Sequence, residues 1–148
     1  NEQFMQRFAG QMQCLKRQEG HDMDREQVLY LLQEIYFDNI DSGNADLAVE
    51  AMHSDVVWVH TQVWEHDGHN RDSLDTLSGR EELRAFLTSR IPEMQREGIE
   101  HKVRKVIIDG KEGAFQAQVV GPDGDAKDFF GWIELRDGKI GRYRVIPH

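Results

Sequence analysis

The chain has 148 residues, which is enough for one domain with its own core and too short to suggest a second. Its hydrophobic fraction of 39% and charged fraction of 30% are ordinary for a soluble globular protein and exclude a disordered chain. Lys and Arg number 18 against 27 Asp and Glu, so the formal net charge is -9 and we expect neither a nucleic-acid nor a membrane partner.

Residues 1–20 are predicted to form an extension, and residues 21–148 the main domain. Apolar residues recur in the extension at three- and four-residue spacing, at Phe4, Phe8, Met12 and Leu15. This spacing predicts an amphipathic helix that ends before Gly20. The helix packs either on a partner subunit or on its own domain, and the pattern leaves both open.

Two more helices are predicted before the first strand. Asp24 and Gln27 resemble a capping pair, and the helix after them is apolar on one side as far as Gly43. Its apolar side carries Val28, Leu31, Leu32, Ile35 and Tyr36. A short second helix is expected from Asp46 to Met52.

A strand and a third helix follow. The segment DVVWVH at 55–60 is β-branched and aromatic, which predicts a strand covered on both faces. The polar stretch 61–77 is too long for a tight turn and long enough to act as a lid over a pocket. Ser78 and Glu81 resemble a capping box for the third helix, which we expect Pro92 to end or kink.

Asp-Gly turns separate the remaining segments, which predict four strands at 99–108, 113–120, 126–135 and 139–146. The order of elements predicts an α+β fold. We expect a curved antiparallel sheet of about five strands, ending in a four-stranded meander, that wraps around the N-terminal helices as a cone with an internal pocket.

Four segments between residues 36 and 146 resemble, in order and spacing, the SnoaL-like branch of the nuclear transport factor 2-like superfamily. They are YFDNIDSGNADLAVEAMHSDVVWVH, LSGREELRAFL, IEHKVRKVIIDGKEGAFQ and ELRDGKIGRYRVI. The resemblance implies the cone-shaped fold. It leaves the activity open, because that fold hosts isomerases, cyclases, dehydratases, lyases and structural modules.

The resemblance does not extend to two catalytic patterns of the superfamily. The tyrosine of ketosteroid isomerases matches Tyr36, but their base aspartate falls at Thr61 and their acid aspartate at about Gly131. The acid/base aspartate of SnoaL-type polyketide cyclases also falls at Gly131. Neither set of catalytic groups is complete here.

A third pattern matches better. Scytalone dehydratase and hexachlorocyclohexane dehydrochlorinase pair an aspartate at the end of the first helix with a histidine in the second strand, and the matching residues are Asp41 and His101. The spacing from Asp41 to Trp58 also matches the dehydrochlorinase. The second histidine of the dehydratase falls at about Phe115, and the tyrosine before its aspartate at Ile40, so the match is partial.

An Asp-His pair suits proton abstraction, because the carboxylate holds one imidazole tautomer and stabilises the imidazolium. Strand alternation directs His101 inward with Ile99 and Val103. On an ideal helix Asp41 lies about 140° from the centre of the apolar stripe that contains Tyr36, so the pair requires the helix to fray or bend there. The alternatives are a core histidine and a plain helix-end aspartate.

The expected pocket is largely apolar and suits a small apolar or aromatic ligand. Its predicted substrate-binding residues are Trp58, His60, Val103, Phe115, Phe129, Ile133 and Arg144. His60 supplies a hydrogen bond or a group that titrates near neutral pH, and Arg144 is a candidate partner for an anion. The alternatives are that Trp58 and the other apolar side chains fill the core and that His60 lies at the surface.

The remaining motifs give no cofactor or metal site. His66, Asp67 and His69 are residue types that bind zinc, but a solvated loop with a glycine explains them. The sequence has no phosphate-binding loop and no nucleophile elbow. The single Cys14 can form neither an intramolecular disulfide nor a cysteine zinc site, and we expect a cytoplasmic location.

The sequence therefore predicts a cofactor-independent lyase, dehydratase or isomerase, with His101 as the base, Asp41 orienting it and Tyr36 donating a hydrogen bond. The alternative is a non-catalytic module for ligand binding or dimerisation. Phe130 and Trp132 on the outer face of the sheet favour a homodimer. Charged residues on the same face, Lys102, Arg104 and Glu134, oppose a wholly apolar interface.

Overall fold

The structure is a computed structural model that describes residues 22–66 and 68–148. The helix predicted within residues 1–20 lies outside the described residues. Six strands form one sheet in the order β2-β1-β6-β5-β4-β3. They are β1 (Met52–Thr61), β2 (Leu74–Ser78), β3 (Glu100–Asp109), β4 (Glu112–Val120), β5 (Ala126–Arg136) and β6 (Lys139–Pro147).

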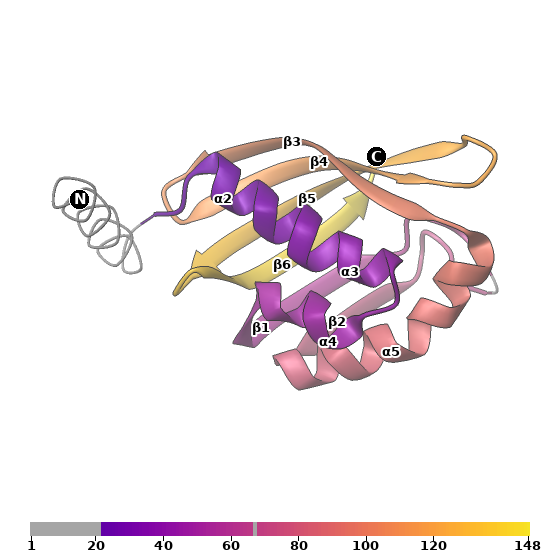
Figure 1. Ribbon diagram of the computed structural model, residues 1–148, viewed down its shortest axis with the longest axis horizontal. Coiled ribbons are helices and arrows are strands. Elements are labelled where there is room, and N and C mark those ends of the chain that lie inside the picture. Colours follow the sequence, from indigo (N-terminus) through magenta and orange to yellow (C-terminus); the bar gives the residue numbers. More distant parts are fainter. Residues whose placement is uncertain (1–21, 67) are drawn as a thin grey trace, which may run out of the picture.

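The helices cover one face of this curved, unclosed sheet, so the predicted α+β class is confirmed. One helical run, in three parts, lies across the sheet, while α5 lies beside β1 and β2 (Figure 1). The run consists of α2 (Arg25–Leu29), the π-helix η1 (Tyr30–Phe37) and α3 (Asp38–Asp41). It is followed by α4 (Ala45–Ala48), the short 3₁₀ helix η2 (Val49–Ala51) and, after β2, α5 (Arg80–Glu97).

The first helical run begins at the predicted cap. The Gln27 backbone N–H donates to Asp24 Oδ1 at 2.8 Å, and the Asp24 backbone N–H donates to Gln27 Oε1 at 2.9 Å. Each of the two side chains thereby accepts a backbone N–H of the first turn that has no acceptor within the helix.

The middle of the run departs from α-helical geometry. Across η1 the backbone bonds span five residues rather than four, and at its end the Asp38 N–H donates to the Gln33 carbonyl. Such a segment rotates the residues that follow it about the helix axis relative to an ideal α-helix. Asp41 is thereby brought toward β3, which ideal helical spacing did not allow.

The helix α5 differs from its prediction at its N-terminus, and it does not end at Pro92. Its N-cap is Gly79, and the expected capping box is absent: instead the Ser78 N–H donates to Glu82 Oε2 at 2.9 Å. Pro92 lies within the helix, which continues to Glu97 and ends at Gly98 with a φ of 67°. A glycine takes up this left-handed conformation without steric cost.

The sheet contains a strand that the sequence did not predict. β2 begins at Leu74, in the stretch 61–77 that was expected to be a polar loop, and it pairs antiparallel with β1 at the sheet edge. A second difference is that β1 pairs in parallel with β6, so the sheet is not wholly antiparallel. The four strands β3 to β6 form the predicted meander.

Register shifts in β3 and β6 set which side chains of these strands face the helices. In β3 the shift falls between Val103 and Lys105, and in β6 it leaves Gly141 as an extra residue between the pairs of Ile140 and Arg142. Each bulge reverses the alternation of side chains beyond it. The buried residues after the second bulge are therefore Tyr143 and Val145.

Candidate functional site

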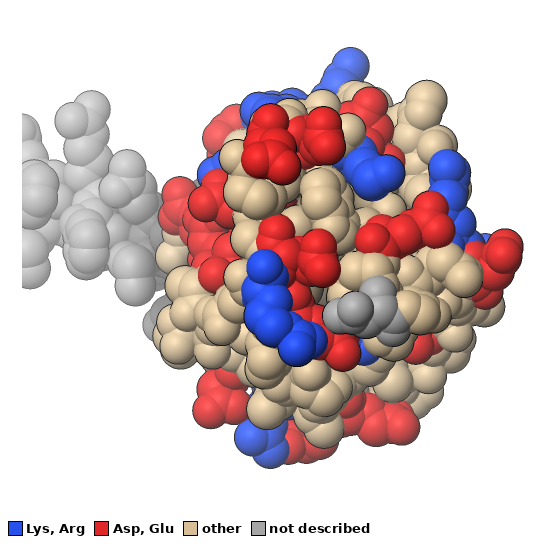
Figure 2. Space-filling view, turned by 90° about the vertical axis from the view of Figure 1, so that its right-hand side faces the viewer, with Lys and Arg blue, Asp and Glu red and all other residues tan. Residues whose placement is uncertain are grey.

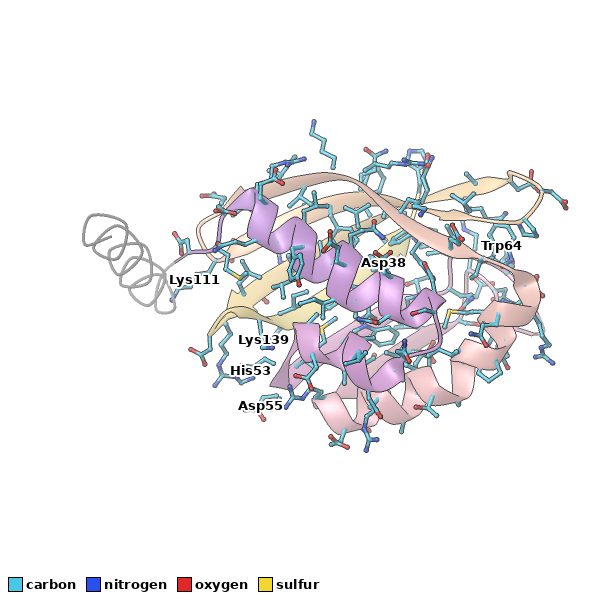
Figure 3. The ribbon with its side chains drawn as sticks, viewed as in Figure 1. Asp38, His53, Asp55, Trp64, Lys111 and Lys139 are labelled. Carbon is cyan, nitrogen blue, oxygen red and sulfur yellow. The ribbon has the colours of Figure 1, made fainter. Side chains whose placement is uncertain are left out.

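A cavity of about 70 Å³ lies between the first helical run, α5 and the concave face of the sheet. It is at the end of the molecule where α5 ends and β3 begins; Trp64 marks this end in Figure 3, and His53 and Asp55 mark the opposite one. Aromatic side chains form much of its wall: Tyr36, Phe37, Trp58, Trp64, Phe86, Phe129 and Tyr143. Its polar residues are His60, Gln62, His66, Arg90, Glu93 and His101.

Asp41 and His101 are in contact. Asp41 Oδ1 lies 2.6 Å from His101 Nδ1, and Asp41 Oδ2 accepts the His101 backbone N–H at 2.8 Å. A carboxylate only accepts, so Nδ1 carries the proton that donates to it, and Nε2 is the free nitrogen of the neutral ring. His101 lines the cavity, and Asp41 lies behind it, outside the cavity wall.

Three residues of the helical run hold the free edge of β3. Gln33 donates from Nε2 to the His101 carbonyl at 2.9 Å and accepts the Val103 N–H at 2.7 Å. Phe37 stacks on the His101 ring, with centroids 5.0 Å apart and an interplanar angle of 8°. Gln33, Phe37 and Asp41 follow one another at four-residue intervals, so one side of the run fixes the position and tilt of the imidazole.

Tyr36 lies within a buried hydrogen-bond network. Its hydroxyl accepts the Trp58 indole N–H at 2.9 Å and is also hydrogen-bonded to Tyr143. Burial raises the pKa of both tyrosines well above its ordinary value, so both hydroxyls stay protonated at physiological pH. Tyr36 lines the cavity. A hydrogen bond from its hydroxyl to a ligand would therefore extend this network.

His60 stands next to Trp58 on the cavity wall. The two rings stack, with centroids 5.1 Å apart and an interplanar angle of 9°. Burial, with smaller contributions from the charges of His101 and Arg90, lowers the pKa of His60 from 6.5 to about 4. The ring is therefore neutral at pH 7, and its Nδ1 is buried without a hydrogen-bond partner.

A second polar cluster joins the 62–73 loop to α5. His66 Nε2 lies 3.5 Å from Glu93 Oε2, and His69 Nε2 lies 3.7 Å from the same oxygen. Arg90 lies between two carboxylates, at 3.8 Å from both Glu93 and Asp75. His66 Nε2 and Glu93 Oε2 are buried and have no hydrogen-bond partner.

This cluster is not arranged as a metal site. Within residues 22–66 and 68–148, no group of three or more His, Cys, Asp or Glu side chains is placed to hold a metal ion. Asp67, the remaining residue of the zinc-like motif, lies outside the described residues.

The structure brings Tyr36, Trp58, His60, His101 and Phe129 together around the cavity. The other predicted pocket residues do not line it. Phe115 and Ile133 are buried in the core, and Val103 packs against the core. Arg144 is exposed on the outer face of the sheet, because the bulge at Gly141 turns Tyr143 and Val145 inward in its place.

A phenyl ring fills the space beside Gly131, the position at which the resemblance to ketosteroid isomerases and polyketide cyclases would place an aspartate. Phe115 and Gly131 are paired across β4 and β5, and a Cβ built on Gly131 would lie 2.1 Å from the Phe115 ring. Real Cβ atoms do not approach other atoms this closely, so no side chain fits at position 131 while Phe115 keeps its place.

The sequence interpretation overlooked the side of α5 that faces the cavity. This side carries Phe86, Arg90, Glu93 and Met94. Their spacing of four, three and one is that of one helix face, and this pattern was available in the sequence. The charges of Arg90 and Glu93 concealed it, because such residues normally mark a solvent-exposed face.

Comparison with known protein families identifies the family of this chain. Residues 34–143 match the model of the SnoaL-like domain, which covers most of the chain. The protein belongs to this family, a branch of the nuclear transport factor 2-like fold. No curated protein matches the sequence. Within the described residues, no helix combines the length and apolar character that crossing a membrane requires.

Solved structures are similar in fold. A cystatin-like protein from Methylobium petroleophilum PM1 is 11% identical, with a TM-score of 0.62 over 85% of this chain and 78% of that chain. An LEH-like epoxide hydrolase from M. tuberculosis is 17% identical, with a TM-score of 0.56 over 83% and 84%. A de novo designed protein with a curved β-sheet is 21% identical, with a TM-score of 0.60 over 85% and 88%. Identities this low show the shared fold alone.

Proposed function

We propose that the protein is a cofactor-independent enzyme of the lyase, dehydratase or isomerase type, with His101 as its base. One observation carries the proposal: Asp41 Oδ1 lies 2.6 Å from Nδ1 of a histidine that lines an aromatic cavity. The carboxylate stabilises the imidazolium that forms when Nε2 takes a proton from a bound molecule.

The surroundings of the ring suit this role. Phe37 stacked on one face keeps the imidazole from turning, and the Gln33 side chain fixes the backbone on both sides of it. Such support holds a catalytic group in its productive orientation. Tyr36 supplies a protonated hydroxyl in the same cavity, suited to hydrogen-bonding an oxygen on which negative charge develops.

The substrate is a small molecule with an apolar or aromatic body and an acidic carbon–hydrogen bond. Removal of that proton leads to β-elimination if a leaving group is attached to the adjacent carbon, and to isomerisation if the proton returns elsewhere. The small cavity and its aromatic wall match such a body.

The test is a screen of small β-hydroxy ketones, β-halo ketones and unsaturated ketones in D₂O, followed by proton NMR. We expect elimination products, or deuterium at the acidic carbon, with the wild-type protein. His101→Gln should abolish this turnover and keep the fold. His148→Gln, which changes an exposed histidine outside the cavity, should turn over as the wild type does. Full turnover by His101→Gln would contradict the proposal.

The outer face of the sheet supports the second candidate, a role in self-association. Phe130, Trp132 and Ile146 are 38%, 45% and 46% exposed, and Phe130 pairs with Ile146 across neighbouring strands. Apolar side chains grouped in this way mark interaction surfaces. We propose a homodimer through this face, which Trp132→Glu should dissociate. A wild-type mass of one chain in light scattering at micromolar concentration would contradict it.

A further inference from the structure

The polar end of the cavity presents acceptors that lack a donor. His66 Nδ1 lies 3.0 Å from the Trp64 carbonyl, which can only accept, so Nδ1 carries a proton, and a ring with that one proton presents a lone pair at Nε2. This atom lies 3.5 Å from Glu93 Oε2, another acceptor, and both atoms are buried without a hydrogen-bond partner. Two buried acceptors facing each other are costly unless a donor satisfies them.

The charged groups around the cavity also favour a cation over an anion. Among the described residues that line it, Arg90 is the one with a fixed positive charge, and it already lies between the Asp75 and Glu93 carboxylates. The Asp41 carboxylate lies behind His101, and His60 is neutral at pH 7. A bound anion would add to this excess of negative charge in a poorly hydrated space, whereas a cation would balance it.

The wall and the surface at this end also suit a cation. Aromatic faces attract cations, and Phe86 on the cavity wall already carries one, the Arg90 guanidinium at 4.9 Å from its ring centroid. Figure 2 looks at this end of the molecule, and acidic side chains are spread over it more widely than basic ones. An approaching cation is therefore attracted before it enters.

We infer that the ligand of this cavity is a small primary ammonium compound with an aromatic or apolar body, whose ammonium group binds Glu93 Oε2 and His66 Nε2. These two atoms are close enough for one nitrogen to donate to both. The body lies along the aromatic wall toward His101. The inference rests on the proposed function in one respect only: both place the ligand in this cavity. Binding of the ammonium compound does not require that the protein turn it over.

The test is calorimetric titration at pH 7 with three ligands of similar shape: benzylammonium, benzyl alcohol and benzoate. We expect benzylammonium to bind most tightly and benzoate most weakly. Glu93→Gln keeps the shape of the side chain and removes its charge, and it should weaken benzylammonium on the order of 10-fold to 100-fold, with little effect on benzyl alcohol. Glu100→Gln, at an exposed carboxylate outside the cavity, should leave all three affinities unchanged.

The same titrations with His101→Gln separate this inference from the proposed function. Retained benzylammonium binding by that variant, with or without catalysis by the wild type, supports the inference. Tighter binding of benzoate than of benzylammonium, equal binding of all three, no binding of any, or an unchanged benzylammonium affinity in Glu93→Gln would overturn it.

Discussion

The Asp41 carboxylate contacts His101 with both oxygens, one on the ring at 2.6 Å from Nδ1 and one on the backbone N–H at 2.8 Å. The first contact sets the tautomer of the neutral His101 ring, with the proton on Nδ1. The second occupies a donor at the free edge of β3, so the same side chain joins the helical run to the sheet. Structure and proposed chemistry therefore depend on one carboxylate.

Asp41→Asn should separate these two roles. The amide oxygen can still accept the backbone N–H, whereas an amide N–H facing Nδ1 favours the opposite tautomer, with the proton on Nε2. We expect turnover of a substrate found in the screen to fall by about 10²-fold or more, with the fold retained. Asp109→Asn, at an exposed position of the same strand, is the control and should be active. Unchanged turnover in Asp41→Asn would show that the carboxylate has no catalytic role.

Gly131→Ala tests the close approach of Phe115. The added methyl group would overlap the ring, and overpacking of this kind lowers the free energy of unfolding by about 1–3 kcal/mol. In Phe115→Ala the ring is gone, so Gly131→Ala should cost much less in that background. Urea denaturation of the four proteins measures this coupling, and strict additivity would disprove the clash.

The tyrosine pair predicts instability in alkali. Burial raises the pKa of Tyr36 and Tyr143 above the ordinary value of 10.0, so in alkali the unfolded chain releases protons that the folded one retains. The free energy of unfolding should be insensitive to these groups below pH 10 and fall as the pH rises above it. Tyr36→Phe should make this fall shallower in urea denaturation between pH 8 and 11. An equally steep fall in the variant would contradict the assignment.

His60 predicts the opposite dependence in acid. Its pKa is lowered from 6.5 to about 4, so the unfolded chain takes up a proton before the folded one does. The stability contributed by neutral His60 is present above pH 6.5 and is lost as the pH falls toward 4, by up to about 3 kcal/mol. In His60→Gln the free energy of unfolding should vary less over this interval. The difference in pH dependence between the wild type and the variant gives the contribution of His60, because the other histidines are the same in both proteins.

Much of the fold followed from local patterns. The Asp24 cap, the Asp-Gly turns and the inward direction of His101 depend on neighbouring residues, which the sequence displays directly. The pairing of Asp41 with His101 came from family resemblance rather than from helical spacing, which opposed it.

The remaining features depend on contacts between distant segments. The π-helical segment contains Gln33, whose side chain is hydrogen-bonded to β3, about 70 residues away in the sequence. β2 is a short edge strand held by β1, with too few apolar residues to reveal itself. Arg144 was misplaced because one extra residue at Gly141 reverses the alternation, and a bulge of this kind leaves little trace in the sequence.

The most direct test of the account is the tautomer of His101, measured from the ¹⁵N chemical shifts of its ring nitrogens in the neutral state, with His101→Gln used to assign the signals. We predict a protonated Nδ1, hydrogen-bonded to Asp41, and an unprotonated Nε2 that is free to act as a base. A ring protonated at Nε2 would contradict this, because it could not accept a proton from a molecule bound in the cavity.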